Sequence, residues 1–335
     1  MDYPLVSIIM PIRNEAAYIE RSLRAILVQD YPLENMEIII VDGMSDDGTR
    51  EIIANYQQPT TNYKFFLLDN PSKIVPVALN IGLKQAKGEV IIRVDGHCEI
   101  APDYVRRCVE VLQETGADCV GGTQHSVGEW FLSSTIALAT TSPFGAGDAY
   151  FRYARAARWA ESVYLGAYRK DVFERIGTFD EELVRNQDNE FEIRLRQAGG
   201  KIWLDPFIRC VYYSRQRLDG IWLQYFQYGV YRVRVIQKRH KILYRQLVPP
   251  IFVLAFILSL LTSLFKKQPI WFLSIIVPYI IVNITFSLGF SRKKLQTMPI
   301  LAIVFFILHF AWGLGFIYGL WRWRKFWFSI KKAEG

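Results

Sequence analysis

The triplet Asp95-Gly96-His97 places a carboxylate and an imidazole two residues apart, and such a pair can hold a divalent cation. The triplet follows an apolar run, residues 89–94, that should form a β-strand. Ligands of open α/β sheets bind just beyond the carboxyl ends of the strands. A cation at that edge suits a substrate that carries phosphate groups. The competing interpretation is a turn aspartate beside a partly buried histidine, so the assignment depends on the rest of the chain.

The elements that would carry this pair form the pattern of an α/β domain. Apolar runs at 6–11, 37–41 and 64–68 predict further strands, and helical periodicity follows at 16–27 and 75–86. This alternation implies a doubly wound, mainly parallel sheet. The chain contains neither G-x-G-x-x-G nor G-x-x-x-x-G-K-[ST]. Their absence argues against a dinucleotide Rossmann site and against a P-loop.

Acidic residues follow the first two predicted strands. Glu15 could contact a ligand, or it could be a first-turn carboxylate that favours the helix dipole. Asp42 comes at the end of the second strand. Asp46 and Asp47 follow it, and either could be a turn or N-cap residue, which is the interpretation that we favour for Asp47.

Four segments, in this order along the chain, resemble the motifs of family 2 glycosyltransferases, which have a GT-A fold: residues 6–15, 39–49, 80–97 and 186–202. The resemblance covers about residues 5–215. The D-G-H triplet, with residues 142–145 and 164–169, most resembles the bacterial succinoglycan-biosynthesis type. Members of that type extend sugar chains built on membrane lipid carriers.

The resemblance implies a role for the residues at each strand end. Asp42 would accept a hydrogen bond from the nucleotide base, most often uracil, and the turn 11–15 would contact base and ribose. Asp95 and His97 match the family's D-x-D or D-x-H position, which binds Mg²⁺ or Mn²⁺ on the diphosphate of the donor. Lys73 and Arg93 could add positive charge or could be solvated surface residues. The expected contacts with the nucleotide sugar are thus Pro11, Arg13, Glu15, Asp42, Lys73, Asp95 and Gly96.

A catalytic base is the second requirement of such a transfer. Asp188 matches the family's catalytic aspartate, which takes the proton from an acceptor hydroxyl as that oxygen attacks the anomeric carbon. Family members commonly have Glu-Asp here, and this chain has Gln187 before Asp188. The competing interpretation of Asp188 is an N-terminal helix carboxylate. A glycoside hydrolase carboxylate pair is a poorer alternative, because hydrolysis does not need the metal site. Direct displacement would invert the anomeric centre.

The composition changes along the chain. Of 335 residues, 51% are hydrophobic, and the formal net charge is +8. Three long apolar stretches, 247–265, 270–290 and 298–320, each approach the ~20 residues needed to span a bilayer. A helical core domain is the alternative. The predicted organisation is a cytosolic GT-A domain (1–215), amphipathic interfacial helices (216–245) and a membrane region with about three hydrophobic helices (246–335).

The charges that flank the apolar stretches disagree about topology. Seven basic residues precede the first stretch and place that end inside by the positive-inside rule: Arg232, Arg234, Lys238, Arg239, His240, Lys241 and Arg245. Three spans would then leave the tail outside, yet the tail is also basic. Either the charge rule fails there, or one apolar stretch is re-entrant or interfacial. No secretory signal precedes the first strand, and the four cysteines form no C-x-x-C pair, so we expect a cytosolic domain with reduced thiols at the inner or plasma membrane.

Residues 218–232 interleave aromatic side chains with Gln and Arg, as in an interfacial helix. Gln227, Tyr231 and Arg232 are the candidates for contact with the acceptor or the membrane interface. The segment only loosely resembles the Q-x-x-R-W motif of processive synthases, so extrusion of a polymer is doubtful and a simple anchoring helix is the alternative. His309 could have an intramembrane function, with a helix-packing role as the default.

The sequence therefore predicts a membrane-anchored, metal-dependent, inverting glycosyltransferase. It would move a sugar from a nucleotide diphosphate donor, most often a UDP-sugar, to a lipid-linked saccharide such as a polyprenyl diphosphate saccharide. One alternative is transfer directly onto a polyprenyl phosphate, and another is a noncatalytic nucleotide-sugar-binding scaffold. The basic flanks favour anionic membrane lipids as partners. We find no nucleic-acid recognition motif.

Overall fold

The computed structural model describes residues 3–56, 64–147, 149–291 and 294–325. The chain forms two compact units, which are described separately. Unit 1 comprises Met1–His125 and Ala149–Tyr213, and unit 2 comprises Ser126–Asp148 and Ser214–Gly335. The segment between residues 126 and 148 therefore belongs with the C-terminal helices.

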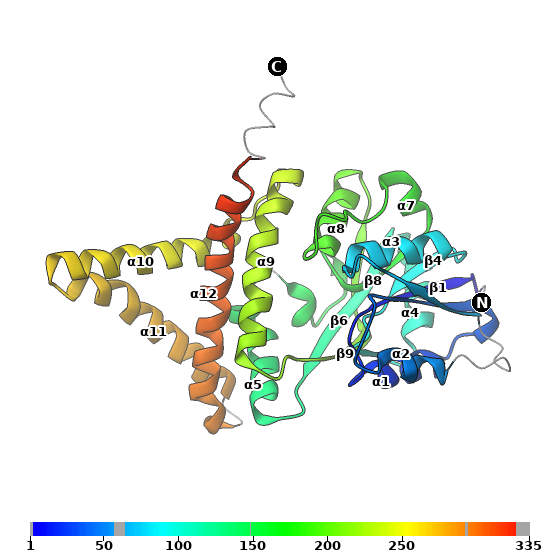
Figure 1. The fold of residues 1–335 in the computed structure, drawn as a ribbon, viewed down its shortest axis with the longest axis horizontal. Coiled ribbons are helices and arrows are strands. Elements are labelled where there is room, and N and C mark those ends of the chain that lie inside the picture. Colours follow the sequence, from blue (N-terminus) through cyan, green and yellow to red (C-terminus); the bar gives the residue numbers. More distant parts are fainter. Residues whose placement is uncertain (1–2, 57–63, 148, 292–293, 326–335) are drawn as a thin grey trace, which may run out of the picture. The chain divides into compact units, whose positions relative to one another are not determined.

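Unit 1 is built on a nine-stranded sheet in the order β3-β2-β1-β4-β8-β6-β9-β5, with β7 paired to β9. The strands are β1 (Val6–Ile12), β2 (Met36–Asp42), β3 (Lys64–Asp69), β4 (Val90–Arg93), β5 (Cys98–Ile100), β6 (Cys119–Val127), β7 (Arg158–Trp159), β8 (Tyr164–Arg169) and β9 (Ile202–Tyr213). Figure 1 shows the sheet with helices packed on it.

The first half of the sheet is parallel, as expected. β1 pairs with β2 and β4, and β2 with β3, all in parallel. The second half differs, because β8 pairs antiparallel with both β4 and β6, and β5 and β7 pair antiparallel with β9. In the parallel half, each connection between consecutive strands contains a helix, which is the usual long crossover that parallel pairing needs. The GT-A fold class predicted from the sequence is confirmed, with a mixed sheet.

The central strands β1 and β2 are buried on both faces, which explains their continuous apolar sequences. Alternate residues serve two cores. Ile8 and Ile38 face the helices α1 (Ile19–Leu27), α2 (Thr49–Ala54) and α4 (Tyr104–Thr115). Ile9 and Ile39 face the helices α3 (Val75–Gln85), α7 (Asp171–Ile176) and α8 (Gln187–Gln197). The unit is thus a three-layered α/β/α domain.

The predicted boundaries are close to those observed, with one difference next to the site. The first helix was expected from residue 16, but α1 begins at Ile19. The carbonyl oxygen of Glu15 accepts hydrogen bonds from the backbone N–H groups of Tyr18 and Ile19, at 2.8 Å each. Residues 13–18 therefore form a turn, which leaves the Glu15 side chain at the carboxyl edge of the sheet.

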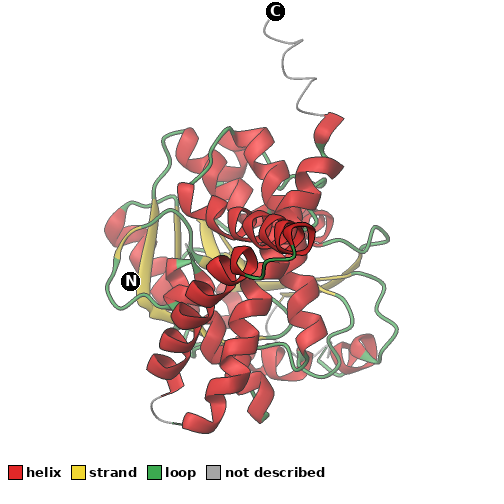
Figure 2. Cartoon of the chain, turned by 90° about the vertical axis from the view of Figure 1, so that its left-hand side faces the viewer, coloured by secondary structure: helices red, strands yellow, loops and turns green. Residues whose placement is uncertain are grey.

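Unit 2 is helical apart from the last residues of β6 (Figure 2, red). Its helices are α5 (Phe131–Thr140), α6 (Pro143–Ala146), α9 (Leu218–Arg239), α10 (Val248–Lys266), α11 (Ile270–Ser291) and α12 (Met298–Arg322). The apolar stretches expected at 247–265, 270–290 and 298–320 are confirmed as helices. All three are long and apolar enough to cross a membrane.

Helices α9 and α12 pack closely through glycines. A Cβ atom on Gly315 would stand 2.0 Å from the Phe226 carbonyl oxygen, and one on Gly229 would stand 2.2 Å from that of Trp312. A Cβ on Gly319 would be 2.8 Å from the Val230 carbonyl oxygen. Because no side chain fits at these positions, the two backbones approach as they do in small-residue helix pairs.

Asn80 on α3 forms hydrogen bonds with Phe179, in the segment that precedes α8. Its Nδ2 donates to the Phe179 carbonyl oxygen at 2.9 Å, and its Oδ1 accepts from the Phe179 N–H at 3.0 Å. All of these groups are buried, so removing the amide would leave the backbone groups of Phe179 unpaired. We expect Asn80→Ala to lower the free energy of unfolding of the detergent-solubilised protein by about 2 kcal/mol. Thermal unfolding measures this. Lys84→Ala, an exposed change on the same helix, is the control, and equal melting temperatures for both variants would contradict the assignment.

Candidate functional site

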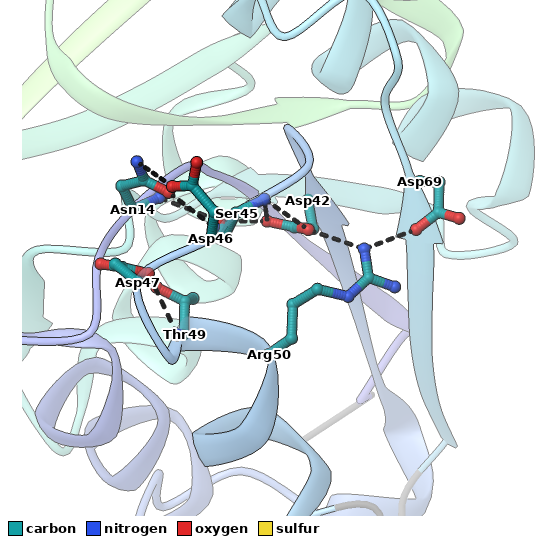
Figure 3. Close-up of polar contacts among 8 residues, drawn as sticks. All are labelled: Asn14, Asp42, Ser45, Asp46, Asp47, Thr49, Arg50 and Asp69. Carbon is teal, nitrogen blue, oxygen red and sulfur yellow. Dashed lines mark hydrogen bonds and ion pairs between the residues drawn. The ribbon is translucent and has the colours of Figure 1, made fainter.

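The ends of β2 and β3 are joined by an ionic cluster (Figure 3). Asp42, the last residue of β2, is fully buried. Its carboxylate accepts hydrogen bonds from the N–H and the hydroxyl of Ser45 and from Arg50 Nη1, the last at 2.8 Å. Arg50 Nη1 also donates to Asp69 Oδ1 at 2.8 Å. Asp42 thus lies at the strand end where the sequence placed it, and neighbouring residues already bind its oxygens.

The loops after β1 and β2 are bound to each other (Figure 3). Asn14, in the left-handed conformation at φ 56°, donates from Nδ2 to Asp46 Oδ1 at 2.9 Å. The Asp46 N–H donates back to Asn14 Oδ1 at 3.1 Å. Asp47 accepts from the N–H groups of Thr49 and Ala16 at 3.1 and 3.0 Å. Asp47 is therefore a turn residue, as predicted, and the paired loops hold Glu15 in place.

Pro11, Arg13 and Lys73 lie around this edge. Pro11 is buried in β1 beside Val41. Arg13 is exposed, and its Cβ lies 3.1 Å from where a Cβ of Gly43 would stand, so a side chain at position 43 would crowd Arg13. Lys73 is exposed in the turn before α3, with φ 60°. Their contact with a nucleotide stays a prediction.

Asp95 and His97 come together just beyond β4. Ligand atoms of Asp95, His97 and Cys98 all lie within 4.8 Å of one another. His97 Nδ1 is 2.9 Å from Glu15 Oε1, which orients the ring and leaves Nε2 as the remaining nitrogen. Gly96 allows this approach, because a Cβ there would be 2.9 Å from Ile12 and 3.0 Å from Glu15. A carboxylate and an oriented imidazole are a donor set for a divalent cation.

Cys98 is a poor third ligand. Its side chain is fully buried, and its Sγ lies 3.0 Å from the Tyr164 hydroxyl. Burial raises the pKa of the Cys98 thiol well above its ordinary value, and the nearby Asp95 carboxylate acts in the same direction. Burial and the neighbouring carboxylate thus disfavour the thiolate, which is the form that binds metals. The ligands offered are therefore oxygen and nitrogen.

Arg93 bridges the metal-ligand candidate to the base candidate. Its Nε and Nη2 each lie 2.8 Å from Asp95 Oδ1, and its Nη1 donates to Asp188 Oδ1. The Arg93 side chain is only 13% exposed. Arg93 is thus an internal ion-pair partner and not the solvated surface residue that the sequence left open. Arg93 therefore links the start of α8 to the end of β4.

Asp188 is the second residue of α8 and follows Asn186, which has φ 62°. Its side chain is 42% exposed, although its carboxylate faces Arg93 inside the site. Desolvation raises the pKa of Asp188 above its ordinary value, and Arg93 opposes this rise. A raised pKa makes an aspartate a stronger base. Gln187, which replaces the usual acid, is buried.

Two supporting residues were not identified from the sequence. Tyr164 donates from its hydroxyl to Asp95 Oδ2 at 3.4 Å, and burial raises the pKa of this phenol well above its ordinary value. Glu192 accepts the Val163 N–H at 2.9 Å one turn after Asp188. Both residues could have been identified from the sequence. Tyr164 belongs to a segment that carried the family resemblance, and Glu192 shares a helical face with Asp188.

Gln227, Tyr231 and Arg232 lie on α9 in unit 2, whereas Asp95, His97 and Asp188 belong to unit 1. The Tyr231 ring is 6.1 Å from that of Trp323 on the same unit. Arg232 is 8% exposed. Their role toward an acceptor stays a prediction.

The parallel strands, the acidic strand ends and the D-x-H pair define a GT-A glycosyltransferase. Residues 7–177 match the model of the family described as "Glycosyl transferase family 2". The chain belongs to this family. Asp188 lies just beyond the matched residues.

Two relatives match nearly the whole chain. "Succinoglycan biosynthesis protein ExoA" of Rhizobium meliloti (strain 1021) is 31% identical over 92% of this chain and 93% of its own length. A "Dolichyl N-acetyl-alpha-D-glucosaminyl phosphate 3-beta-D-2,3-diacetamido-2,3-dideoxy-beta-D-glucuronosyltransferase" of Methanococcus voltae is 28% identical over 94% of this chain and 97% of its own.

The solved structure of "Mannosyltransferase PcManGT from Pyrobaculum calidifontis in complex with GDP-Man and Mn2+" is similar in fold. It superposes with a TM-score of 0.62 at 19% identity, and the match covers 96% of this chain and 88% of that one. At 19% identity, this similarity supports a shared fold and nothing beyond it. It includes most of both units of the present chain.

Glu192 makes the stability of unit 1 depend on pH. Burial raises the pKa of Glu192 well above its ordinary value, and the hydrogen bond from Val163 opposes the rise only in part. A raised folded-state pKa gives stability that is complete below the unfolded pKa of about 4.3 and is lost as pH rises. We expect Glu192→Gln, which keeps the acceptor oxygen, to melt progressively higher than the wild type between pH 5 and pH 8. Glu114→Gln, an exposed change, should show no such trend, and a constant difference for Glu192→Gln would refute the account.

Proposed function

We propose that this glycosyltransferase moves a sugar from a nucleotide diphosphate donor, for which a UDP-sugar is the preferred assignment, to a lipid-linked saccharide. The transfer would invert the anomeric carbon. The observation that carries the proposal is the bridge from Asp95 through Arg93 to Asp188. It joins the proposed cation ligand and the proposed base in one cluster at the carboxyl edge of the sheet. A transfer of this kind needs both groups near one anomeric carbon.

The donor would lie along the carboxyl ends of β1, β2 and β4. Asp42 would face the base, and the turn containing Pro11, Arg13 and Glu15 would contact base and ribose. Asp95 and Gly96 would lie beside the diphosphate, with Lys73 adding positive charge. The occupied oxygens of Asp42 support a positioning role for Ser45 and Arg50, which hold that carboxylate in one orientation.

Asp95 and His97 would hold Mg²⁺ or Mn²⁺. A bound cation would act as a Lewis acid that stabilises the negative charge of the departing nucleoside diphosphate. Mg²⁺ prefers oxygen ligands, so the imidazole of His97 favours Mn²⁺. Glu15 would hold His97 in the tautomer that presents Nε2.

Asp188 would act as the general base. Its carboxylate takes the proton of the acceptor hydroxyl as that oxygen forms a bond to the anomeric carbon. The bond from the anomeric carbon to the phosphate oxygen breaks on the opposite face, and its electron pair leaves with the nucleoside diphosphate. Arg93 would act as a positioning residue, since it holds Asp188 beside Asp95. No covalent intermediate is needed.

The acceptor assignment rests on the relatives and on unit 2. By its name, one relative acts in succinoglycan biosynthesis, and the other acts on a dolichyl-phosphate-linked sugar. Three candidate membrane helices support attachment to the inner or plasma membrane with the GT-A domain in the cytosol. Gln227, Tyr231 and Arg232 on α9 would contact the acceptor or the interface. We retain residues 1–215, 216–245 and 246–335 as the proposed catalytic, interfacial and membrane regions.

Replacing Asp188 by Asn removes the base while it keeps the shape of the side chain. We expect the rate of nucleotide release with a membrane lipid extract as acceptor to fall by about 10²–10⁴-fold. Nucleotide binding measured by calorimetry should change little. Asp171→Asn, an exposed carboxylate of the same unit, is the control. Unchanged turnover in Asp188→Asn would exclude this base, and binding without turnover in the wild type would favour the scaffold function.

Binding of Mn²⁺ to the purified protein, followed by electron paramagnetic resonance, tests the ligand assignment. We expect Asp95→Asn to abolish specific binding and Glu15→Gln to weaken it by about 10-fold, because the second removes the group that orients His97. Cys98→Ser should bind as the wild type does. Loss of binding in Cys98→Ser with retention in Asp95→Asn would reverse the assignment.

A further inference from the structure

Unit 2 contains three apolar helices, but they differ in how much of their surface the protein itself covers. In the most apolar windows, 17% of the α10 span and 11% of the α11 span are buried, against 44% for α12. Leu258, Leu261 and Phe265 on α10 are 61%, 56% and 84% exposed. Two of the helices thus present apolar surface on most sides, whereas almost half of the third is covered by the protein.

Helix α12 is enclosed by α9 along much of its length. Trp222 lies 6.3 Å from Phe310, Phe226 lies 5.7 Å from Tyr318, and Tyr231 lies 6.1 Å from Trp323, measured between ring centroids. The N–H of Trp323 Nε1 donates to the Val230 carbonyl oxygen at 3.3 Å. The two helices therefore run parallel and must lie at the same depth in any membrane.

Helix α9 cannot readily lie at the centre of a bilayer. Trp222 on α9 lies beside Phe310, which is midway along α12, and Arg217 and Asp219 form an exposed ion pair less than two helical turns before Trp222. Arginine at the centre of a hydrocarbon core is costly, and such residues are confined to interfaces or to polar cavities. Because α9 and α12 share one depth, this cost applies to both of them. An interfacial position for the pair avoids it.

The exposed residues of α12 fit an interface. Tyr318 and Trp321 are 40% and 58% exposed near its C-terminal end, and Arg322 and Arg324 follow. Tyrosine and tryptophan are enriched where the headgroups meet the hydrocarbon, and basic side chains extend to the lipid phosphates. This end of α12 therefore has the chemistry of a helix that lies on anionic lipid.

Helices α10 and α11 leave α12 as a V-shaped hairpin (Figure 1, left). The first turn of α10 crosses α12 at Gly313, where a Cβ would be 2.5 Å from the Pro249 carbonyl oxygen. Phe256 still contacts α12, with its ring centroid 5.2 Å from that of Phe310, and the roughly ten residues of α10 beyond it project for about 15 Å. An amphipathic interfacial helix lies ~5–10 Å deep. The hairpin tip at Lys267 would then lie ~20–25 Å into a ~30 Å core, and the side chains of Lys266 and Lys267 would extend to the far interface.

The middle of α11 is hydrogen-bonded to α12. Tyr279 Oη lies 3.0 Å from His309 Nδ1, and Asn283 Nδ2 donates to the Ala302 carbonyl oxygen at 3.0 Å. His309 Nε2 lies 2.8 Å from the Phe144 carbonyl oxygen, which makes Nε2 the donor and Nδ1 the acceptor. His309 thus has the helix-packing role that was its default, and these bonds join α11 to α12.

We propose that α10 and α11 cross the bilayer as a two-helix hairpin, that α12 lies in the inner interface beside α9, and that the C-terminal tail is on the same side as unit 1. The charges agree. With two crossings, the far side carries only Lys266 and Lys267, and the basic clusters at 232–245, 292–294 and 322–332 all lie on one side. Ranges 126–148 and 214–335 together contain 18 Lys and Arg against 4 Asp and Glu, which suits an anionic lipid surface.

This topology removes the conflict between three apolar stretches and a basic tail. The proposal concerns the side on which each segment lies and does not depend on the proposed reaction. A failure of the transferase assays would leave it untouched, and a wrong topology would leave the chemistry of unit 1 untouched.

Labelling of the full-length protein in its membrane with a membrane-impermeant maleimide tests the proposal. Gln268→Cys reports the hairpin tip, Gln296→Cys the connection before α12, and Lys332→Cys the tail. Lys64→Cys, an exposed position, reports the side of unit 1. The four native cysteines are buried, so the wild type measures the background. Lys267→Cys is a second tip variant in case Gln268→Cys does not accumulate.

In sealed vesicles of one orientation we expect the tip variant to be labelled from one side and the other three from the opposite side, each with at least a tenfold preference. Labelling of Lys332→Cys from the same side as the tip would show that α12 crosses and would overturn the proposal. Tip variants that react from neither side until detergent is added would show a hairpin that stops inside the bilayer, which would also overturn it.

Discussion

The ion pairs of Arg93 are the interaction on which the site depends. Two carboxylates, Asp95 in the turn after β4 and Asp188 on α8, bind the same side chain although they are far apart in the sequence. Without a cation between them they would repel, and their partial burial would raise the free energy of both charged forms. A guanidinium can bind two carboxylates at once through separate N–H groups, which an ammonium does less well. The bridge therefore determines where α8 begins relative to the end of β4.

The other contacts of the site extend from this bridge through the loops at the same edge. Tyr164 reaches Asp95 from β8, Glu15 reaches His97 from the loop after β1, and the 43–49 loop holds the 13–16 loop. The parallel strands end at one edge, so short loops suffice to bring their side chains together. The same edge contains several non-glycine residues with positive φ, including Asn14 and Asn186. Such conformations are tolerated where surrounding contacts hold them.

The sequence predicted much of this because the pattern is local. Continuous apolar runs identify β1 and β2 as strands buried on both faces, and the D-x-H triplet is visible without a fold. The antiparallel half was not predicted, because β8 and β6 owe their direction to pairing between distant segments and not to any crossover motif. Arg93 shows the same limit within the site. From the sequence, Arg93 could be a solvated residue or the partner of a distant carboxylate. Its partner Asp188 is 95 residues away, so only the fold distinguishes the two cases.

Sequence alone determined the apolar length of the three C-terminal helices, the position of the acidic strand ends and the membership in the family, since each depends on residue type and spacing along the chain. Tertiary structure decided which residues meet: Glu15 with His97, Arg93 with Asp188, and α9 with α12 through their glycines. It also decided how far each apolar helix is covered by protein, which hydropathy does not report. The physical reason is the same in every case. Local preferences are set by neighbours in the chain, whereas ion pairs and close packing are set by neighbours in space.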